Sequence, residues 1–157
     1  MARSDTMQLV MSNKQIDIQF TVNAVDVASA SVLPSIGCGG ECIFVGRTRP
    51  ENNEHHGDLL ALQYDCYQEM AETELQKLAQ EAVNRFEARH VRIIHSVGKV
   101  AIHEASVVIA VASNHRDDAF TACRFLIDLL KQRVPIWKQE MWADGTTWSD
   151  GVPIATS

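Results

Sequence analysis

The sequence predicts a single α+β domain with a mainly antiparallel sheet and two principal helices. Strand-like runs are interrupted by two helical patterns, without the regular alternation of strand and helix that a parallel sheet needs. No glycine-rich phosphate-binding motif follows any of the strands. The chain has 157 residues, of which 46% are apolar and 22% charged, and no linker divides it. We therefore expect one domain at residues 15–150, with a flexible tail at 1–14 and a second tail at 151–157.

The amino-terminal part predicts a strand and then a short helix. The segment IDIQFTV, which begins at Ile16, alternates apolar and polar residues as a half-buried strand does. Residues 24–33 have the composition of a short helix, and Pro34 ends it.

Two further strands flank a long charged loop. The run from Glu41 to Gly46 is apolar and partly β-branched, which predicts a strand buried on both faces. Residues 47–57 contain proline, asparagine and glycine without periodicity, so we expect a loop, and a loop of this length is a candidate working surface. At residues 59–67 the pattern is again that of a strand. The residues on one side of it are Leu60, Leu62 and Tyr64.

The clearest helix covers residues 68–89. Its apolar residues recur at steps of three and four, and acidic residues lie near its amino-terminal end. The apolar positions are Leu75, Leu78, Ala79, Ala82, Val83 and Phe86. Residues 91–97 and 105–113 then predict two strands that pair with each other.

A second long helix follows these strands. Ser113 or Asn114 can cap it, and it must end before Pro135, because the residue that precedes a proline disfavours the helical conformation. Its apolar stripe is formed by Phe120, Cys123, Ile127 and Leu130. The segment IWKQEMW after it is extended, and Asp144-Gly145 is typical of a hairpin turn.

Composition argues against several classes of protein. The formal net charge is −6, unlike that of a module that binds nucleic acid through a broad basic face. The longest apolar run, residues 107–112, is far shorter than the ~20 residues of a membrane-spanning helix, and the amino terminus lacks the apolar core of a signal peptide. We expect a cytoplasmic protein with no membrane or nucleic-acid partner. The four cysteines, at positions 38, 42, 66 and 123, form no CxxC pair, so we expect reduced thiols, mostly in the core.

Cationic residues are concentrated in the second half of the chain. Lys131 ends the second long helix, and Lys138 follows seven residues later, beyond a turn at Pro135. If the two ammonium groups converge, each disfavours the charged form of the other, which makes either lysine a candidate base or nucleophile. The alternative interpretation is two solvated lysines at the surface.

Two further groups of residues are candidate anion sites. Arg47 and Arg49 flank Thr48 directly after a predicted strand, and a pair of guanidinium groups suits phosphate or carboxylate. His115 and Arg116 stand where a helix begins, and free backbone N–H groups favour an anion there. Each group is also compatible with an ordinary charged loop or helix start.

A metal site has little support. His55 and His56, with Cys38 and Cys42, supply the residue types of a zinc site, but their spacing matches no common zinc motif. No motif of the GxSxG kind accompanies the histidines, so a hydrolase triad has no support either. We expect no metal.

Four segments, in this order, resemble the large, catalytic subunit of molybdopterin synthase. They are FVGRTRP from Phe44, LQYDCYQEMAE from Leu62, SNHRDDAFTACRFLIDLLK from Ser113 and RVPIWKQE from Arg133. An HR pair at a helix start, a lysine at the helix end and then VPIWK form a specific ordered set, although no single piece is specific. The resemblance extends from about Ile16 to Trp148, and it implies a fold of the α/β hammerhead type.

The resemblance implies a sulfurtransferase of molybdenum cofactor biosynthesis. Such an enzyme adds two sulfur atoms to cyclic pyranopterin monophosphate and so forms the dithiolene of molybdopterin. Each sulfur arrives as a thiocarboxylate on the Gly-Gly carboxyl terminus of a small, ubiquitin-like partner subunit. Two large subunits form a central homodimer, and a small subunit at each end completes a heterotetramer. This chemistry requires no tightly bound cofactor.

By the same resemblance, the cationic groups line one substrate pocket. The residues that contact the pterin phosphate or neighbouring anions are Arg47, Thr48, Arg49, His115 and Arg116. Those that line the same pocket are Lys131, Lys138, Gln139 and Glu140. The two lysines are the implied catalytic pair: Lys131 stands beside the thiocarboxylate carbon as acid or base, with transient capture of the acyl group as a side path, and Lys138 holds substrate charge. The alternatives from other classes are a docking module for a Gly-Gly-ended partner, without turnover, and a binder of simple phosphate ligands.

Overall fold

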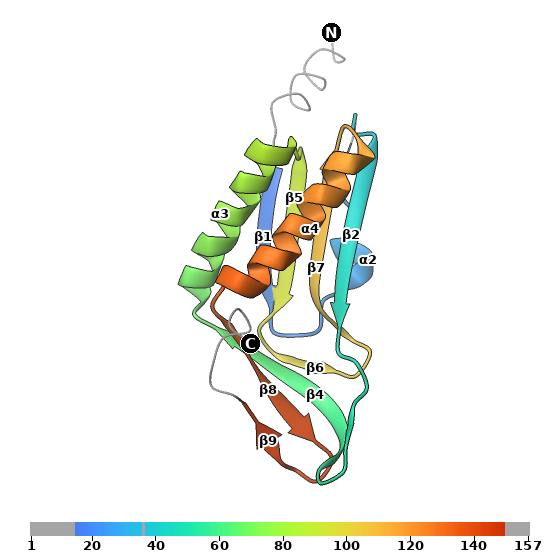
Figure 1. Cartoon of the computed structure of the whole chain (residues 1–157), viewed down its shortest axis with the longest axis vertical. Helices are drawn as coiled ribbons and strands as arrows, with labels where there is room; N and C mark the ends of the chain where they lie inside the picture. Colours follow the sequence, from blue (N-terminus) through green and yellow to red (C-terminus); the bar gives the residue numbers. More distant parts are fainter. Residues whose placement is uncertain (1–14, 36, 150–157) are drawn as a thin grey trace.

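A four-stranded sheet is the larger of the two sheets in the described chain, by the number of residues in its strands (Figure 1). The computed structural model describes residues 15–35 and 37–149. The strands of this sheet, in order across it, are β1 (Gln15–Thr21), β5 (His90–Ser96), β7 (Ala105–Ser113) and β2 (Gly40–Arg47). β1 and β5 are parallel, and the other neighbours are antiparallel. The predicted α+β class and the pairing of β5 with β7 are thus confirmed. The predicted tails at residues 1–14 and 151–157 lie outside the described residues.

Two long helices, α3 (Gln68–Phe86) and α4 (Arg116–Arg133), cover one face of this sheet, and most of the core lies beneath them (Figure 1). The predicted stripe of α3 is buried at Leu75, Leu78, Ala79, Ala82 and Val83. The helix ends before residue 89, because Glu87 takes a left-handed conformation with φ of 53°. On α4 the buried stripe is Ala119, Ala122, Cys123, Leu126 and Leu130. Phe120 was predicted to belong to it but is 59% exposed.

The prediction that β2 is buried on both faces is wrong. β2 lies at the edge of the sheet, and its residues Glu41, Ile43 and Arg47 are exposed. β7, one strand further in, is the strand whose nine residues are all buried. An apolar run in the sequence does not distinguish an edge strand from its neighbour, because the pairing partners come from distant parts of the chain.

A smaller sheet is built around β4 (Gly57–Cys66) at the other end of the molecule (Figure 1). Its strands, in order, are β3 (Asn52–Asn53), β4, β8 (Ile136–Trp142) and β9 (Thr147–Trp148), and β6 (Lys99–Ala101) also pairs with β4. Leu60, which was predicted to lie on one side of the strand with Leu62 and Tyr64, is not buried as Tyr64 is. The pairing of β4 with β8 is irregular between Leu59 and Ala61, so these two residues are buried and Leu60 is 52% exposed. The predicted hairpin turn joins β8 to β9, and Gly145 has φ of 85° there.

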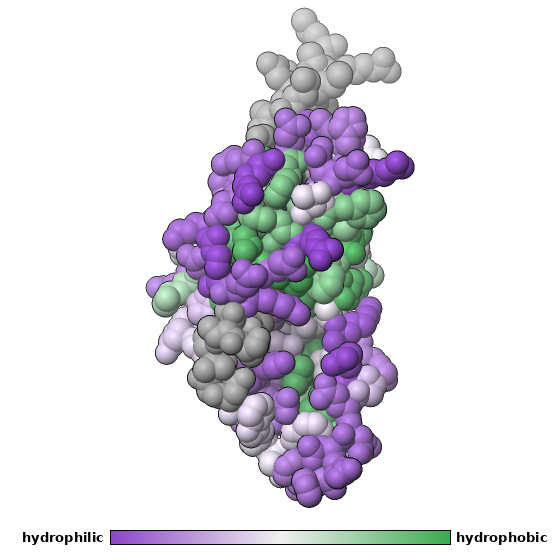
Figure 2. Space-filling model, in the orientation of Figure 1, coloured by the Kyte–Doolittle hydropathy of each residue, from purple (hydrophilic) through white to green (hydrophobic). Residues whose placement is uncertain are grey.

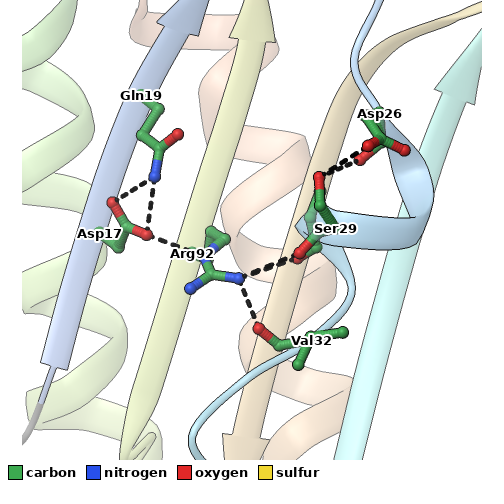
Figure 3. A network of polar contacts seen from close by, with 7 residues as sticks. Asp17, Gln19, Asp26, Ser29, Val32 and Arg92 are labelled. Atoms are coloured by element: carbon green, nitrogen blue, oxygen red, sulfur yellow. Dashed lines mark hydrogen bonds and ion pairs between the residues drawn. The ribbon is translucent and has the colours of Figure 1, made fainter.

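The short helix α2 covers only Val27–Ala30, fewer residues than the predicted 24–33. The side chain of Asp26 caps its amino-terminal end, where it accepts a hydrogen bond from Ala28 N. At the end of this helix and just after it, Arg92 of β5 donates to the carbonyl oxygens of Ser29, Ala30 and Val32 (Figure 3). A guanidinium group therefore satisfies carbonyls that a longer helix would have used itself.

Arg92 also forms an ion pair with Asp17, at 2.8 Å between Nε and Oδ2 (Figure 3). Gln19 donates to the same carboxylate. This network links β1, β5 and the end of α2 on the face of the sheet opposite α3 and α4. The four cysteines are free thiols, of which only Cys123 is buried. No helix in the described parts of the chain is long and apolar enough to cross a bilayer.

Candidate active site

A cavity of about 550 Å³ opens beside the paired strands β4 and β8. Its lining comprises Gln63, Tyr64, Asp65, Val97, Trp137, Lys138, Gln139 and Ser149. The strand register sets Lys138 opposite Tyr64 and Gln139 opposite Gln63. Two of the predicted site residues, Lys138 and Gln139, thus line a concave surface of a size that suits a small-molecule ligand.

The chain reaches this cavity through a sharp turn at the end of α4. Val134 is extended, with φ of −87° and ψ of 127°, as expected of a residue that precedes a proline, and β8 begins at Ile136. Lys131 lies in the last turn of α4, where it is exposed and outside the cavity lining. Glu140 is half-buried on β8, opposite Leu62 on one side and Trp148 on the other.

The aromatic and imidazole groups next to the cavity are neutral. Burial lowers the pKa of His95 to about 4, although a 2.7 Å hydrogen bond from Nδ1 to Ser96 O opposes this shift. The Tyr64 ring packs edge-to-face against His95, with 5.2 Å between ring centroids. Burial also raises the pKa of Tyr64, whose hydroxyl is hydrogen-bonded to Ser106. The charged side chains of the lining are therefore Lys138 and Asp65.

The second predicted group follows β2. Arg47 Nη1 donates to His103 O at 2.9 Å, and Arg49 is 84% exposed, 3.5 Å from a carboxylate oxygen of Glu51. Thr48 between them is buried, with backbone bonds to residues 103 and 104, and its Oγ1 has no hydrogen-bond partner in the described chain. The two guanidinium groups are thus carried by a fixed backbone, and the threonine hydroxyl points inward.

The third predicted group, His115 and Arg116, is exposed at the start of α4. The predicted cap at Ser113 or Asn114 is wrong: His115 is the N-cap residue, and its side chain makes no capping hydrogen bond. The start of β2 packs closely here, because a Cβ on Gly40 would lie 2.9 Å from Arg116 Cα. Only glycine allows this approach.

Sequence reasoning missed Arg89 at this end of the sheet. Its Nη1 donates to Asn114 Oδ1 at 3.0 Å, and its backbone N donates to Ala112 O at 2.9 Å. Because 25 residues separate Arg89 from Asn114, no local spacing could have indicated the contact.

One copy of the chain does not gather all these groups in one pocket. Val97, which lines the cavity, directly follows β5. β5 and β2 run in the same direction, because both are antiparallel to β7, so Val97 and the last residue of β2, Arg47, lie at the same end of the large sheet. His115 and Arg116 lie at the opposite end of β2, beside Gly40. Gly40 and Arg47 are seven steps apart along the strand, which corresponds to about 23 Å at ~3.3 Å per residue.

The residue types of the rejected zinc site do not gather either. Among the described residues, no three His, Cys, Asp or Glu side chains are placed so that they could hold a metal ion.

Comparisons with known proteins indicate one family. The family model described as MoaE protein matches residues 11–133. The human molybdopterin synthase catalytic subunit is 36% identical over 149 residues, which cover 94% of this chain and 77% of that protein. The catalytic subunit from Pyrococcus abyssi is 35% identical over 127 residues, which cover 79% of this chain and 84% of that protein.

Solved structures agree with these relatives. The X-ray structure of molybdopterin synthase from Staphylococcus aureus matches with a TM-score of 0.72 and 28% identity, over 83% of this chain and 94% of that chain. A chain from Helicobacter pylori, solved as a complex of subunits 1 and 2 of molybdopterin-converting factor, has a TM-score of 0.72 at 22% identity, over 85% of this chain and 90% of that chain. The second likeness concerns the fold alone.

Proposed function

Because this chain belongs to the MoaE protein family, we infer that it is the catalytic subunit of a molybdopterin synthase, a sulfurtransferase of molybdenum cofactor biosynthesis. The structural observation that supports this function is the cavity beside the paired strands β4 and β8, whose lining includes Lys138, Gln139 and Trp137. We propose that sulfur transfer takes place there. The substrate is cyclic pyranopterin monophosphate, and the sulfur donor is a thiocarboxylated Gly-Gly terminus of a small partner subunit.

The charges of the site suit these two reactants. The phosphate of the substrate and the thiocarboxylate of the donor are both anions, and the proposed binding residues supply ammonium and guanidinium groups to a protein with a net charge of −6. A cation held beside a low-dielectric wall attracts an anion more strongly than the same cation in water. Here that wall is formed by Trp137 and by Tyr64, whose ring packs on the neutral His95.

The two lysines divide the work in this proposal. Transfer of each sulfur forms a bond from sulfur to a pterin carbon, from which an oxygen substituent leaves with a proton supplied by an acid, and breaks the bond from sulfur to the acyl carbon of the partner. That acyl carbon must therefore pass to another nucleophile, either water or an amine. Lys131, at the end of α4, acts as acid or base in this step and is the amine that can capture the acyl group, while Lys138 holds substrate charge in the cavity.

We further propose that two copies of the chain pair through β2. This strand is an edge of the sheet, hydrogen-bonded only to β7 in the described structure, and an open edge is a template for a second strand. Ile43 on the edge and Phe120 on α4 are 40% and 59% exposed. Figure 2 shows the apolar surface that gathers over α4 and β2. An apolar patch of this kind typically marks an interface.

An antiparallel pair of β2 strands completes the substrate site. With Phe44 of one copy opposite Phe44 of the other, the two-fold axis sets Glu41 opposite Arg47, two residues of opposite charge. The same two-fold rotation places Gly40 of one copy beside the end of β2 in the other copy, where Arg47 and the cavity of that copy lie. His115 and Arg116, which lie next to Gly40, are brought to the same place. Each pocket is then formed by both copies. The four free thiols support a reducing, cytoplasmic location for the complex.

A single-turnover reaction tests the proposed activity. Purified chain, thiocarboxylated small subunit and cyclic pyranopterin monophosphate are mixed, and dithiolene product is followed. Lys138→Ala is expected to lose most of the product, whereas Lys77→Ala, which removes an exposed lysine on α3, is expected to behave as wild type. If wild type binds the small subunit but makes no product, the docking-module alternative replaces the enzyme.

A further inference from the structure

Contacts from outside hold the turn between β7 and α4. Gly39 N donates to Ser113 O at 3.0 Å, just before the turn. Arg89 holds the turn at two points: its backbone N donates to Ala112 O, and its guanidinium group donates to Asn114 Oδ1. Arg89 is thus bonded both to the last part of β7 and to the residue that directly precedes the His115-Arg116 pair.

The turn depends on these contacts because the N-cap residue of α4 does not fix it. His115, the N-cap residue, makes no capping hydrogen bond, although a cap normally fixes the direction in which a chain enters a helix. On the opposite side the backbone fits tightly: a Cβ on Gly39 would lie 2.3 Å from Asn114 O. A small rotation of Asn114 would therefore disturb this packing and would redirect the two side chains that follow.

We propose that Arg89 is a positioning residue of the substrate site, which acts through Asn114 to aim His115 and Arg116 at the pterin phosphate. This inference rests on the proposed function, because it takes His115 and Arg116 as phosphate ligands. It predicts that loss of the Arg89 side chain weakens substrate binding and leaves the chemical step intact, since the catalytic lysines lie at the other end of α4 or on β8.

Arg89 could act instead directly, through its charge. That charge reaches the neighbouring segment, because Arg89 opposes the rise in the pKa of Cys38 that burial causes. The two mechanisms differ in their dependence on Asn114. Removal of the Asn114 side chain abolishes positioning through it and leaves the charge of Arg89 in place.

The test is a double-mutant cycle with Arg89→Ala, Asn114→Ala and the combined variant, assayed for dithiolene formation with saturating small subunit. Each single variant should raise KM for the pterin about tenfold, the effect of losing one hydrogen bond to a charged group, and should change kcat less than about twofold. The combined variant should be no worse than either single variant. Arg89→Lys, which can still donate one bond to Asn114, should recover part of the loss. Lys77→Ala, the charge-matched control, should leave KM unchanged.

Several results would overturn the inference. An unchanged KM for Arg89→Ala would show that the turn needs no such support, and additive effects in the combined variant would assign Arg89 a direct charge role. If Arg89→Ala lowered both kcat and thermal stability, and Arg89→Lys did not restore them, Arg89 would have a structural role only. Calorimetric binding of the pterin to the same variants decides the matter even if wild type makes no product, so failure of the proposed function is distinguishable from failure of this inference.

Discussion

Arg47 and Arg116 stand at opposite ends of the edge strand β2. Arg116 packs against Gly40 at the start of the strand, and Arg47 is the last residue of the strand, held to His103 O. Both are proposed to line the same substrate pocket, so one copy of the chain cannot supply them together. The free edge between them offers the simplest solution, because antiparallel pairing of two copies brings each arginine to its counterpart.

The paired edge predicts a charge-dependent dimer. Glu41→Arg places like charges opposite each other in the proposed register and should weaken the dimer, which sedimentation equilibrium measures as a shift toward monomer at low salt. Glu41→Arg combined with Arg47→Glu restores opposite charges and should restore the dimer. Ile43→Asp should weaken it at any salt concentration. A dimer that none of these variants affects would mean that the chain pairs through another surface.

The Arg92 network predicts a large loss of stability on substitution. Arg92→Met removes the ion pair with Asp17 and the hydrogen bonds to the carbonyls of Ala30 and Val32, and it leaves Gln19 as the remaining side-chain donor to the Asp17 carboxylate. Denaturant unfolding should show a loss of about 2–3 kcal/mol, and Arg92→Lys a smaller one. Arg49→Ala, which removes an exposed pair with Glu51, should change the free energy of unfolding by less than about 0.5 kcal/mol. Equal effects at the two arginines would contradict this account.

His95 predicts a specific dependence of stability on pH. Its pKa is about 4 in the folded chain against 6.5 for an ordinary histidine, so between these values the unfolded chain binds a proton that the folded chain does not. The free energy of unfolding should therefore fall as the pH decreases from 6.5 to about 4, with a contribution on the order of 3 kcal/mol.

The variant that tests this is His95→Phe, which keeps a ring against Tyr64 and cannot titrate. Its stability should depend less on pH in this window than that of wild type. His55→Ala, which removes an exposed histidine, should leave the wild-type slope unchanged. The same slope in His95→Phe and wild type would show that other groups cause the dependence.

The sequence predicts local structure better than the relation between distant segments. The stripe of α3 and the turn at Gly145 depend on neighbouring residues, and both are present in the structure. The exposure of β2 and of Leu60 could not be foreseen, because it depends on which strands lie at an edge and on an irregular pairing with β8. Propensity and periodicity contain no information on either.

The candidate site shows the same division. The chain turns between Lys131 and Lys138 as the proline indicates, and Lys138 lines a cavity. The contact of Arg89 with Asn114 spans 25 residues and leaves no trace in local spacing. The position of Arg116 far from Arg47 follows from the direction of β2 in the sheet, which only the three-dimensional structure reveals.

The most direct measurement is a mixing experiment with two inactive variants, Lys138→Ala and Arg116→Ala. Each alone should form little dithiolene. When the two are dissociated, mixed in equal amounts and reassociated, half of the dimers are mixed, and in each mixed dimer one pocket has both an intact Lys138 and an intact Arg116. If each site is formed by residues of both copies, about a quarter of all pockets are intact, and about a quarter of the wild-type product should be recovered. No recovery, with mixed dimers shown to form, would contradict a site that the two copies share.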